Sequence, residues 1–147
     1  MDYKFNEKSY LYNTIINFIV KNEKLCGIIK SYDIIIPVPI SKKREKQRGY
    51  NQSYLIAKEL SRFLEIQLID YCLYKFKDVI EQSKLNKEER KQNLKNVYLL
   101  KNKEKIRNKK ILLVDDIFTT GATANECCKT LHQANIKEVS ILTIAKD

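Results

Sequence analysis

The residues with the clearest chemical potential are two adjacent carboxylates, Asp115 and Asp116, which directly follow the apolar run Ile111–Val114. The continuous apolar character of this run predicts a buried strand, so both acids should emerge at its carboxyl end. The next residues, Thr119–Thr123, supply three hydroxyl groups and one glycine and lead into a predicted helix. Backbone N–H groups at a helix N-terminus bind anions, and hydroxyl groups add donors. This order predicts carboxylates for sugar hydroxyls beside a phosphate cradle, which together suit a sugar phosphate.

The alternative for this segment is a plain strand end followed by a threonine-capped helix, since each element is common by itself. The ordered combination is unusual, and we therefore favour the sugar-phosphate site. Neither G-x-G-x-x-G nor G-x-x-x-x-G-K-[ST] occurs in the sequence, which argues against a dinucleotide-binding fold and a P-loop NTPase. His132 is the sole histidine and falls in a predicted helix, where we favour a surface or packing role over catalysis.

The alternation of strand-like and helix-like segments predicts an α/β domain with a mostly parallel central sheet flanked by helices. Ligands of such sheets bind beyond the carboxyl ends of the strands, where the strand order reverses. Strands are predicted at Ile34–Ile36, Ile66–Leu73, Val97–Leu100, Ile111–Val114 and Val139–Ile144, with helices at Phe5–Ile29, from the capping residue Asn51 through Leu64, and at Ala122–Gln133.

The stretch Pro37–Gln52 is polar and basic, and we predict that it is a loop. It holds both prolines of the chain, one of its three glycines and two of its five arginines. Glycine and proline serve unusual turns, and guanidinium groups bind phosphate oxygens in pairs. A second polar stretch, Lys75–Asn96, is predicted to be a mobile loop with a short helical piece, and the charge run Lys101–Lys110 a solvated turn.

The segment Leu113–Thr123 resembles the motif with which type I phosphoribosyltransferases bind phosphoribosyl pyrophosphate (PRPP). The resemblance implies a type I phosphoribosyltransferase-like α/β fold. It also implies that Asp115 and Asp116 face the 2- and 3-hydroxyls of the ribose and the associated Mg²⁺, partly through water. The residues that it assigns to the 5-phosphate of PRPP are Thr119, Thr120, Gly121, Ala122 and Thr123.

Two further segments narrow the resemblance to the ComF/GntX family. The first combines Ile36–Ser41, Arg44 and Arg48–Gln52, and in phosphoribosyltransferases this region faces the pyrophosphate. The resemblance therefore implies pyrophosphate contacts by Ile40, Ser41, Arg44 and Arg48. The second segment runs from Gln82 to Leu85 and continues to Arg90 and Asn93. It is similar to a flexible lid over the reacting centre, with Gln82, Lys84 and Arg90 as its contact residues, although a mobile surface loop is an equal alternative.

The resemblance begins near Asp33, which divides the chain into an N-terminal helical segment, 1–32, and a phosphoribosyltransferase-like domain, 33–147. Members of the family usually begin with a cysteine-rich zinc ribbon, and the four cysteines here form no C-x-x-C pair. The hood for the acceptor base is reduced to the helical stretch Tyr3–Lys30. A basic residue expected before the lid is Lys75 or Lys77 rather than arginine.

Two functions from different classes remain open. The resemblance implies an enzyme that uses Mg²⁺ and PRPP, transfers the phosphoribosyl group to an unidentified nitrogenous acceptor and releases pyrophosphate. The alternative is a non-catalytic accessory protein in competence, with single-stranded DNA or a competence helicase as its partner. The net charge of +10 suits DNA, but lysines spread along the chain are also typical of a solvated surface. A third alternative is a degenerate fragment that has neither activity.

The composition of the chain limits the class of protein and the location that we expect. Hydrophobic residues make up 44% and charged residues 31% of the 147 positions, as in a globular domain. The longest apolar run, near Ile15–Val20, falls far short of the ~18 residues that span a bilayer, and no signal peptide is evident. We therefore expect a cytoplasmic protein without a membrane partner and with reduced, mostly buried cysteines. No pattern in the sequence indicates the oligomeric state, and a homodimer is an alternative to a monomer.

Overall fold

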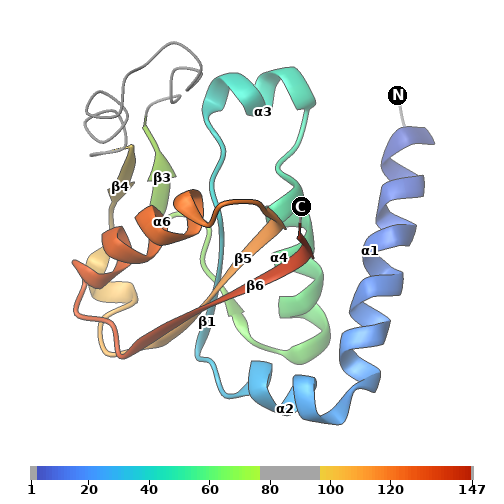
Figure 1. Cartoon of the computed structure of the whole chain (residues 1–147), viewed down its shortest axis with the longest axis horizontal. Coiled ribbons are helices and arrows are strands. Elements are labelled where there is room, and N and C mark those ends of the chain that lie inside the picture. The colour runs from blue at the N-terminus through green and yellow to red at the C-terminus, as the bar shows by residue number, and fades with distance from the viewer. Residues whose placement is uncertain (1–2, 77–96, 147) are drawn as a thin grey trace.

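Figure 1 shows a computed structural model of the chain, which describes residues 3–76 and 97–146 and, in the first helix, side chains from residue 12 onward. Four strands form a parallel sheet in the order β2-β1-β5-β6, and two further strands pair antiparallel in a separate sheet. The predicted α/β fold with a parallel central sheet is therefore confirmed. The main sheet consists of β1 (Ile34–Pro37), β2 (Gln67–Leu68), β5 (Lys110–Phe118) and β6 (Glu138–Lys146), and the small sheet of β3 (Leu73–Lys75) and β4 (Tyr98–Leu100).

The two central strands, β1 and β5, bury apolar side chains on both faces of the sheet. Ile34 and Ile36 of β1 lie in one core cluster and Ile35 in the other, as expected from the alternation of side chains along a strand. In β5, Ile111 and Leu113 join the first cluster, and Leu112 and Val114 join the second. Burial on both faces explains why these strands have continuous apolar runs instead of alternating patterns.

Helices cover both faces of this sheet (Figure 1). On one face, α6 (Ala122–His132) packs with the β3–β4 hairpin against the cluster that contains Ile111. On the other, α4 (Gln52–Leu64) packs against the cluster that contains Leu112, and α1 (Tyr3–Lys21) and α2 (Glu23–Lys30) complete this layer. The predicted helix Ala122–Gln133 and the capping of α4 by Asn51 agree with the structure. The apolar residues of α4, from Leu55 to Leu64, suggest one buried side, but Phe63 among them is 39% exposed.

The N-terminal segment differs from the single helix Phe5–Ile29 that the apolar pattern predicts. It forms two helices that meet at Asn22, whose backbone is extended and whose side chain accepts a hydrogen bond from the N–H of Leu25 at 3.0 Å. An asparagine that satisfies a free N–H group in this way starts a new helix. The break turns the chain so that Ile16 of α1 and Ile29 of α2 both reach the core beside α4.

The stretch Pro37–Gln52, predicted to be a loop, contains a short helix, α3 (Lys42–Arg48). The side chain of Ser41 caps it by accepting a hydrogen bond from the N–H of Arg44 at 3.3 Å, and Gly49 ends it in the left-handed conformation with φ of 81°. Seven polar or charged residues without an apolar face hide this helix from periodicity analysis. The serine cap and the glycine stop were the signals that could have revealed it.

The predicted strand Ile66–Leu73 is wrong as a single element. Its start, β2, pairs with β1, and its end belongs to β3, which pairs antiparallel with β4. The predicted strand Val97–Leu100 therefore lies outside the main sheet. The charge run Lys101–Lys110 is mostly exposed, as expected, but Ile106 is fully buried beyond the short 3₁₀ helix Lys103–Lys105.

The described cysteines are all free thiols, with Cys72 and Cys127 buried and Cys26 and Cys128 partly buried. No helix in the ranges 3–76 and 97–146 has the length and apolar character that a bilayer requires.

Asn51 links β1 to α4, and its loss should destabilise the fold. Its Nδ2 donates to the carbonyl of Val38 at 3.0 Å, and its Oδ1 accepts from the N–H of Ser53 at 3.1 Å. We expect Asn51→Ala to lower the free energy of unfolding by about 1–2 kcal/mol, as for other lost helix caps. Urea unfolding measures this change. Asn125→Ala, at an exposed position of α6, is the matched control, and equal effects of the two substitutions would contradict the linking role.

Candidate functional site

The candidate site lies where β1 and β5 pair in parallel at the centre of the sheet. From β1 the chain proceeds to β2 on one side, and from β5 to β6 on the other, so the strand order reverses between the two strands. Open α/β sheets bind ligands at such a switch point. A cavity of about 160 Å³ opens at the carboxyl ends of β1 and β5, and we call it the small cavity. Its lining includes Asp115, Asp116, Arg44, Arg48, Thr123 and Tyr98.

Asp115 is the most buried acid of the site, with 9% of its surface exposed. Its Oδ1 accepts two hydrogen bonds, from the hydroxyl of Ser53 at 3.0 Å and from the N–H of Asp116 at 3.0 Å. Burial disfavours the charged carboxylate and raises the pKa of Asp115 to about 6, although both of these hydrogen bonds act in the opposite direction. The charged form of Asp115 therefore lowers the stability of the folded protein.

Asp116 is less buried, and its Oδ1 accepts from the N–H of Ile117 at 3.0 Å. The two acids belong to β5, which extends to Phe118 and not only to Val114 as its apolar run predicts. Among the described residues, no cluster of three or more acidic, histidine or cysteine side chains could enclose a metal ion. Two adjacent carboxylates are nevertheless a fitting set for Mg²⁺, which usually takes one or two carboxylates and completes its shell with water and phosphate oxygens.

The segment after β5 turns sharply and starts α6. Gly121 precedes the helix with φ of 75°, and a Cβ atom there would approach Cζ of Phe118 to 2.7 Å, so this position requires glycine. Thr120 accepts a hydrogen bond on Oγ1 from the N–H of Ala122 at 3.3 Å. The N–H groups of the first helical turn have no partner within the helix, because helix geometry leaves the first four unpaired. Thr123, in this turn, is the residue of the predicted phosphate segment that lines the small cavity.

The predicted pyrophosphate residues do not all lie in one place. Ile40, Arg44 and Arg48 line the small cavity opposite the two acids, and Nη1 of Arg48 donates to Oε1 of Gln52 at 3.2 Å. Ser41 is buried, and its hydroxyl caps α3. It lines a neighbouring cavity on the other side of the chain segment Pro39–Ile40. The predicted lid residues Gln82, Lys84 and Arg90 lie outside the described residues.

Two site residues were not predicted from the sequence. Ser53 holds Asp115 from the first turn of α4, and nothing distinguishes it from other serines until the fold brings helix and strand together. Tyr98 of β4 is buried, and burial raises the pKa of its hydroxyl above its usual range, with Cys127 and Thr123 among the groups that act on it. Lys75 of β3, the cross-strand partner of Tyr98, also lines the small cavity. His132 is exposed at the last turn of α6, as predicted.

Comparison with known proteins shows the family to which the chain belongs. Residues 51–147 match the model of the phosphoribosyl transferase domain family, and this range is more than half of the chain. The chain belongs to this family. The phosphoribosyltransferase domain includes both the acidic end of β5 and the segment that follows it, whereas α3 precedes the matched range.

The curated relatives to which this phosphoribosyltransferase-domain protein is similar include competence proteins, in agreement with the sequence resemblance. Competence protein F of Haemophilus influenzae is 32% identical over 98% of this chain and 65% of its own length. Competence protein ComFC of Bacillus subtilis is 33% identical over 77% of this chain and 44% of its own length. DNA utilization protein YhgH of Escherichia coli K12 is 31% identical over 78% of this chain and 49% of its own length. The chain thus spans between 44% and 65% of these relatives.

Solved structures share the fold at low sequence identity. A purine phosphoribosyltransferase from Pyrococcus horikoshii has a TM-score of 0.56 at 22% identity, with 93% of this chain and 73% of that chain covered. A hypoxanthine phosphoribosyltransferase from Staphylococcus aureus has a TM-score of 0.55 at 13% identity, with 92% and 65% covered. At these identities the likeness establishes the type I phosphoribosyltransferase fold and nothing about the substrate.

Removing the charge of Asp115 should stabilise the protein in a pH-dependent way. Because its pKa is raised from 3.8 to about 6 in the folded state, the folded carboxyl binds a proton more tightly than the unfolded one. The resulting penalty on folding is absent below pH 3.8, grows as the pH rises, and is constant above about 6. The amide oxygen of Asp115→Asn can still accept both hydrogen bonds.

We therefore expect Asp115→Asn to raise the free energy of unfolding by about 1–2 kcal/mol at pH 7.5, with the gain shrinking towards pH 4. Urea unfolding at several pH values in the presence of EDTA measures this, and EDTA removes any contribution from bound cations. The exposed Glu104→Gln serves as the control for loss of a negative charge. If the variant is less stable than the wild type at pH 7.5, the charged carboxylate of Asp115 does not destabilise the fold.

Proposed function

We propose that this protein binds PRPP with Mg²⁺ and transfers its phosphoribosyl group to a nitrogenous acceptor, with release of pyrophosphate. The observation that carries the proposal is the position of Asp115 and Asp116. They lie near the carboxyl end of the central strand β5, line the small cavity together with Arg44 and Arg48 of the basic helix α3, and precede the glycine turn into α6. A ribose that carries a phosphate at one end and a pyrophosphate at the other needs these three features together.

The two acids bind the ribose in this proposal. Carboxylates accept hydrogen bonds from vicinal hydroxyl groups, and Asp115 is held in one orientation by Ser53 and by the N–H of Asp116. Displacement at the anomeric carbon builds positive charge on the sugar ring, and the carboxylates of Asp115 and Asp116 offset it. Preorganised charges that meet a developing charge give a large part of enzymatic rate acceleration.

The segment 119–123 binds the 5-phosphate. Gly121 allows the backbone to turn tightly, so the N–H groups of the first turn of α6 face the phosphate together with the threonine hydroxyls. Tyr98 of β4 and Thr123 line the small cavity together. The phosphate is thus bound mainly by groups that the backbone itself positions.

The pyrophosphate is bound on the opposite side, by Arg44 and Arg48, with Ile40 forming part of the wall. Both guanidinium groups are exposed and can form paired hydrogen bonds with phosphate oxygens. Ser41 contributes indirectly, because it holds the start of α3 and so positions Arg44. Mg²⁺ held near Asp115 and Asp116 would neutralise charge on the leaving pyrophosphate. Among the described residues no side chain stands out as a general base, so the acceptor must be nucleophilic itself.

Pyrophosphate release from PRPP across a panel of nucleobases tests the proposal. We expect release with at least one base, and a loss of about 10²–10³-fold for Arg48→Gln, as is typical when a group that stabilises transition-state charge is removed. Arg107→Gln, which removes an exposed guanidinium outside the small cavity, is the matched control. Calorimetry with PRPP and Mg²⁺ should show binding to the wild type that Asp115→Asn abolishes. If PRPP binds but no base supports turnover, the transfer reaction is refuted and PRPP binding alone stands.

A second candidate function is a non-catalytic role in DNA handling. It is favoured by the net charge of +10 and by the names of the relatives, which refer to competence and DNA utilization. A protein that neutralises DNA phosphates with lysines releases counterions, so its affinity must fall steeply with salt. We expect retention on single-stranded DNA at 50 mM salt and a loss of at least about tenfold in affinity at 200 mM. Absence of retention at 50 mM would argue against this role.

A further inference from the structure

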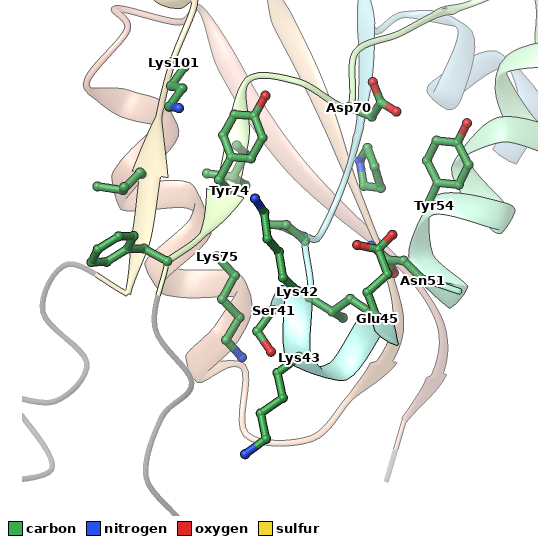
Figure 2. A pocket seen from close by; sticks show the side chains of 16 residues that line it. Ser41, Lys42, Lys43, Glu45, Asn51, Tyr54, Asp70, Tyr74, Lys75 and Lys101 are labelled. Carbon is green, nitrogen blue, oxygen red and sulfur yellow. The ribbon is translucent and has the colours of Figure 1, made fainter. Parts of the chain in front are cut away.

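A second, larger cavity of about 650 Å³ adjoins the small cavity, and Figure 2 shows the side chains that line it. Its floor is formed by the carboxyl end of β1, and its walls by α3, α4 and the β3–β4 hairpin. This volume is typical of pockets that bind small organic ligands, which range over roughly 300–1,000 Å³. The site proposed for PRPP does not use this larger cavity, although Pro39, Ile40, Asn51 and Lys75 line both.

Three aromatic side chains line the larger cavity: Tyr54 of α4, Tyr74 of β3 and Phe76 beyond it. Figure 2 shows that the two tyrosines come from different sides of the cavity. Tyr74 is held in place, since its hydroxyl donates to the carbonyl of Tyr71 at 2.9 Å. Phe76 is 65% exposed, which leaves ring surface available to a ligand. Aromatic surfaces of this kind bind flat rings by stacking.

The charge of the larger cavity favours an anion. Four lysines line it against two acids, Glu45 and Asp70. Within the described part of the chain, Lys42 and Lys43 form no ion pair, so their ammonium groups remain available. Ammonium groups of lysine are common partners of phosphate. The four lysines are Lys42, Lys43, Lys75 and Lys101.

Polar groups are distributed unevenly along the larger cavity. In Figure 2 the carboxylate of Asp70 and the hydroxyl of Tyr54 lie near one end, and the ammonium groups of Lys43 and Lys75 lie toward the opposite end. One end therefore offers an acceptor for the N–H groups of a ring, and the other binds an anion. An apolar ligand would not need the lysines, and a simple anion would not need the aromatic rings.

We propose that the larger cavity is a second ligand site, which binds a mononucleotide with its base among the aromatic side chains near Lys42 and its phosphate at the end of the cavity where Lys43 lies. The site is separate from the small cavity, so it depends on neither Asp115 nor Arg48. It also does not rest on the proposed transferase reaction, because the lining residues recognise the ligand whether or not PRPP binds.

Calorimetry of the full chain with AMP, UMP and ribose 5-phosphate tests this proposal. We expect at least one nucleotide to bind about tenfold more tightly than ribose 5-phosphate, because stacking of the base adds to the phosphate contacts. The double substitution Lys42→Gln and Lys43→Gln should weaken nucleotide binding by about tenfold or more. Lys46→Gln and Lys58→Gln together are the matched control, since both residues are exposed on α3 and α4 and line neither cavity.

The Asp115→Asn variant separates this site from the one proposed for PRPP. Nucleotide binding should survive in Asp115→Asn at the wild-type affinity, even if PRPP binding is lost or never existed. Loss of nucleotide binding in Asp115→Asn, together with retention in the lysine double variant, would place the nucleotide in the small cavity and overturn the proposal. Equal affinities for the nucleotides and ribose 5-phosphate would also overturn it, since the aromatic residues would then have no role, and so would binding of none of the three probes.

Discussion

The parallel pairing of β1 with β5 is the constraint on which the rest of the structure depends. The two strands are paired from Ile34 and Ile111 to Pro37 and Val114, and the N–H of Val38 donates to the carbonyl of Val114 at 2.8 Å. Both strands are buried on both faces, so a shift in register would expose apolar side chains or bury polar ones. Because β1 ends opposite Val114, the acids that follow Val114 in β5 and the basic residues after β1 meet at one edge of the sheet. The small cavity is a direct consequence of that pairing.

The burial of Asp115 is one consequence of this strand pairing. A strand whose apolar part ends at Val114 still continues to Phe118, so the first acid stays within the sheet and is almost fully buried. The protein compensates with two hydrogen bonds to one carboxylate oxygen, and the raised pKa shows that the compensation is incomplete. A fold selected for stability alone would place a neutral residue here. Retention of the carboxylate points to a ligand that uses its charge, which agrees with the position of Asp115 at the switch point.

The sequence was sufficient for the parts of the fold that local patterns determine. The glycine and threonines before α6 and the asparagine before α4 predict a helix start and a cap, and the structure has both. The apolar run before Asp115 predicts a buried strand, which the structure has, although the strand continues to Phe118. The elements that were predicted wrongly depend on contacts between distant segments of the chain. No local signal shows that Ile66–Leu73 is divided between two sheets. The division arises because β2 pairs with β1, whereas β3, which follows it, pairs with β4. Ser53 and Tyr98 acquire their roles in the same way, since each meets the site through pairing or packing that its own neighbours in sequence do not determine.

The segment that follows β1 lines two cavities. Pro39 and Ile40 form the wall between the small and the larger cavity, and Asn51 holds this wall by its bond to Val38 while it caps α4. Arg44 and Arg48 of α3 line the small cavity, whereas Lys42 and Lys43 of the same helix line the larger one. A helix of seven residues turns by about 100° per residue, so its basic side chains necessarily diverge to both sides. A short polar helix without a buried face, which periodicity cannot detect, is therefore the element that supplies cations to both cavities.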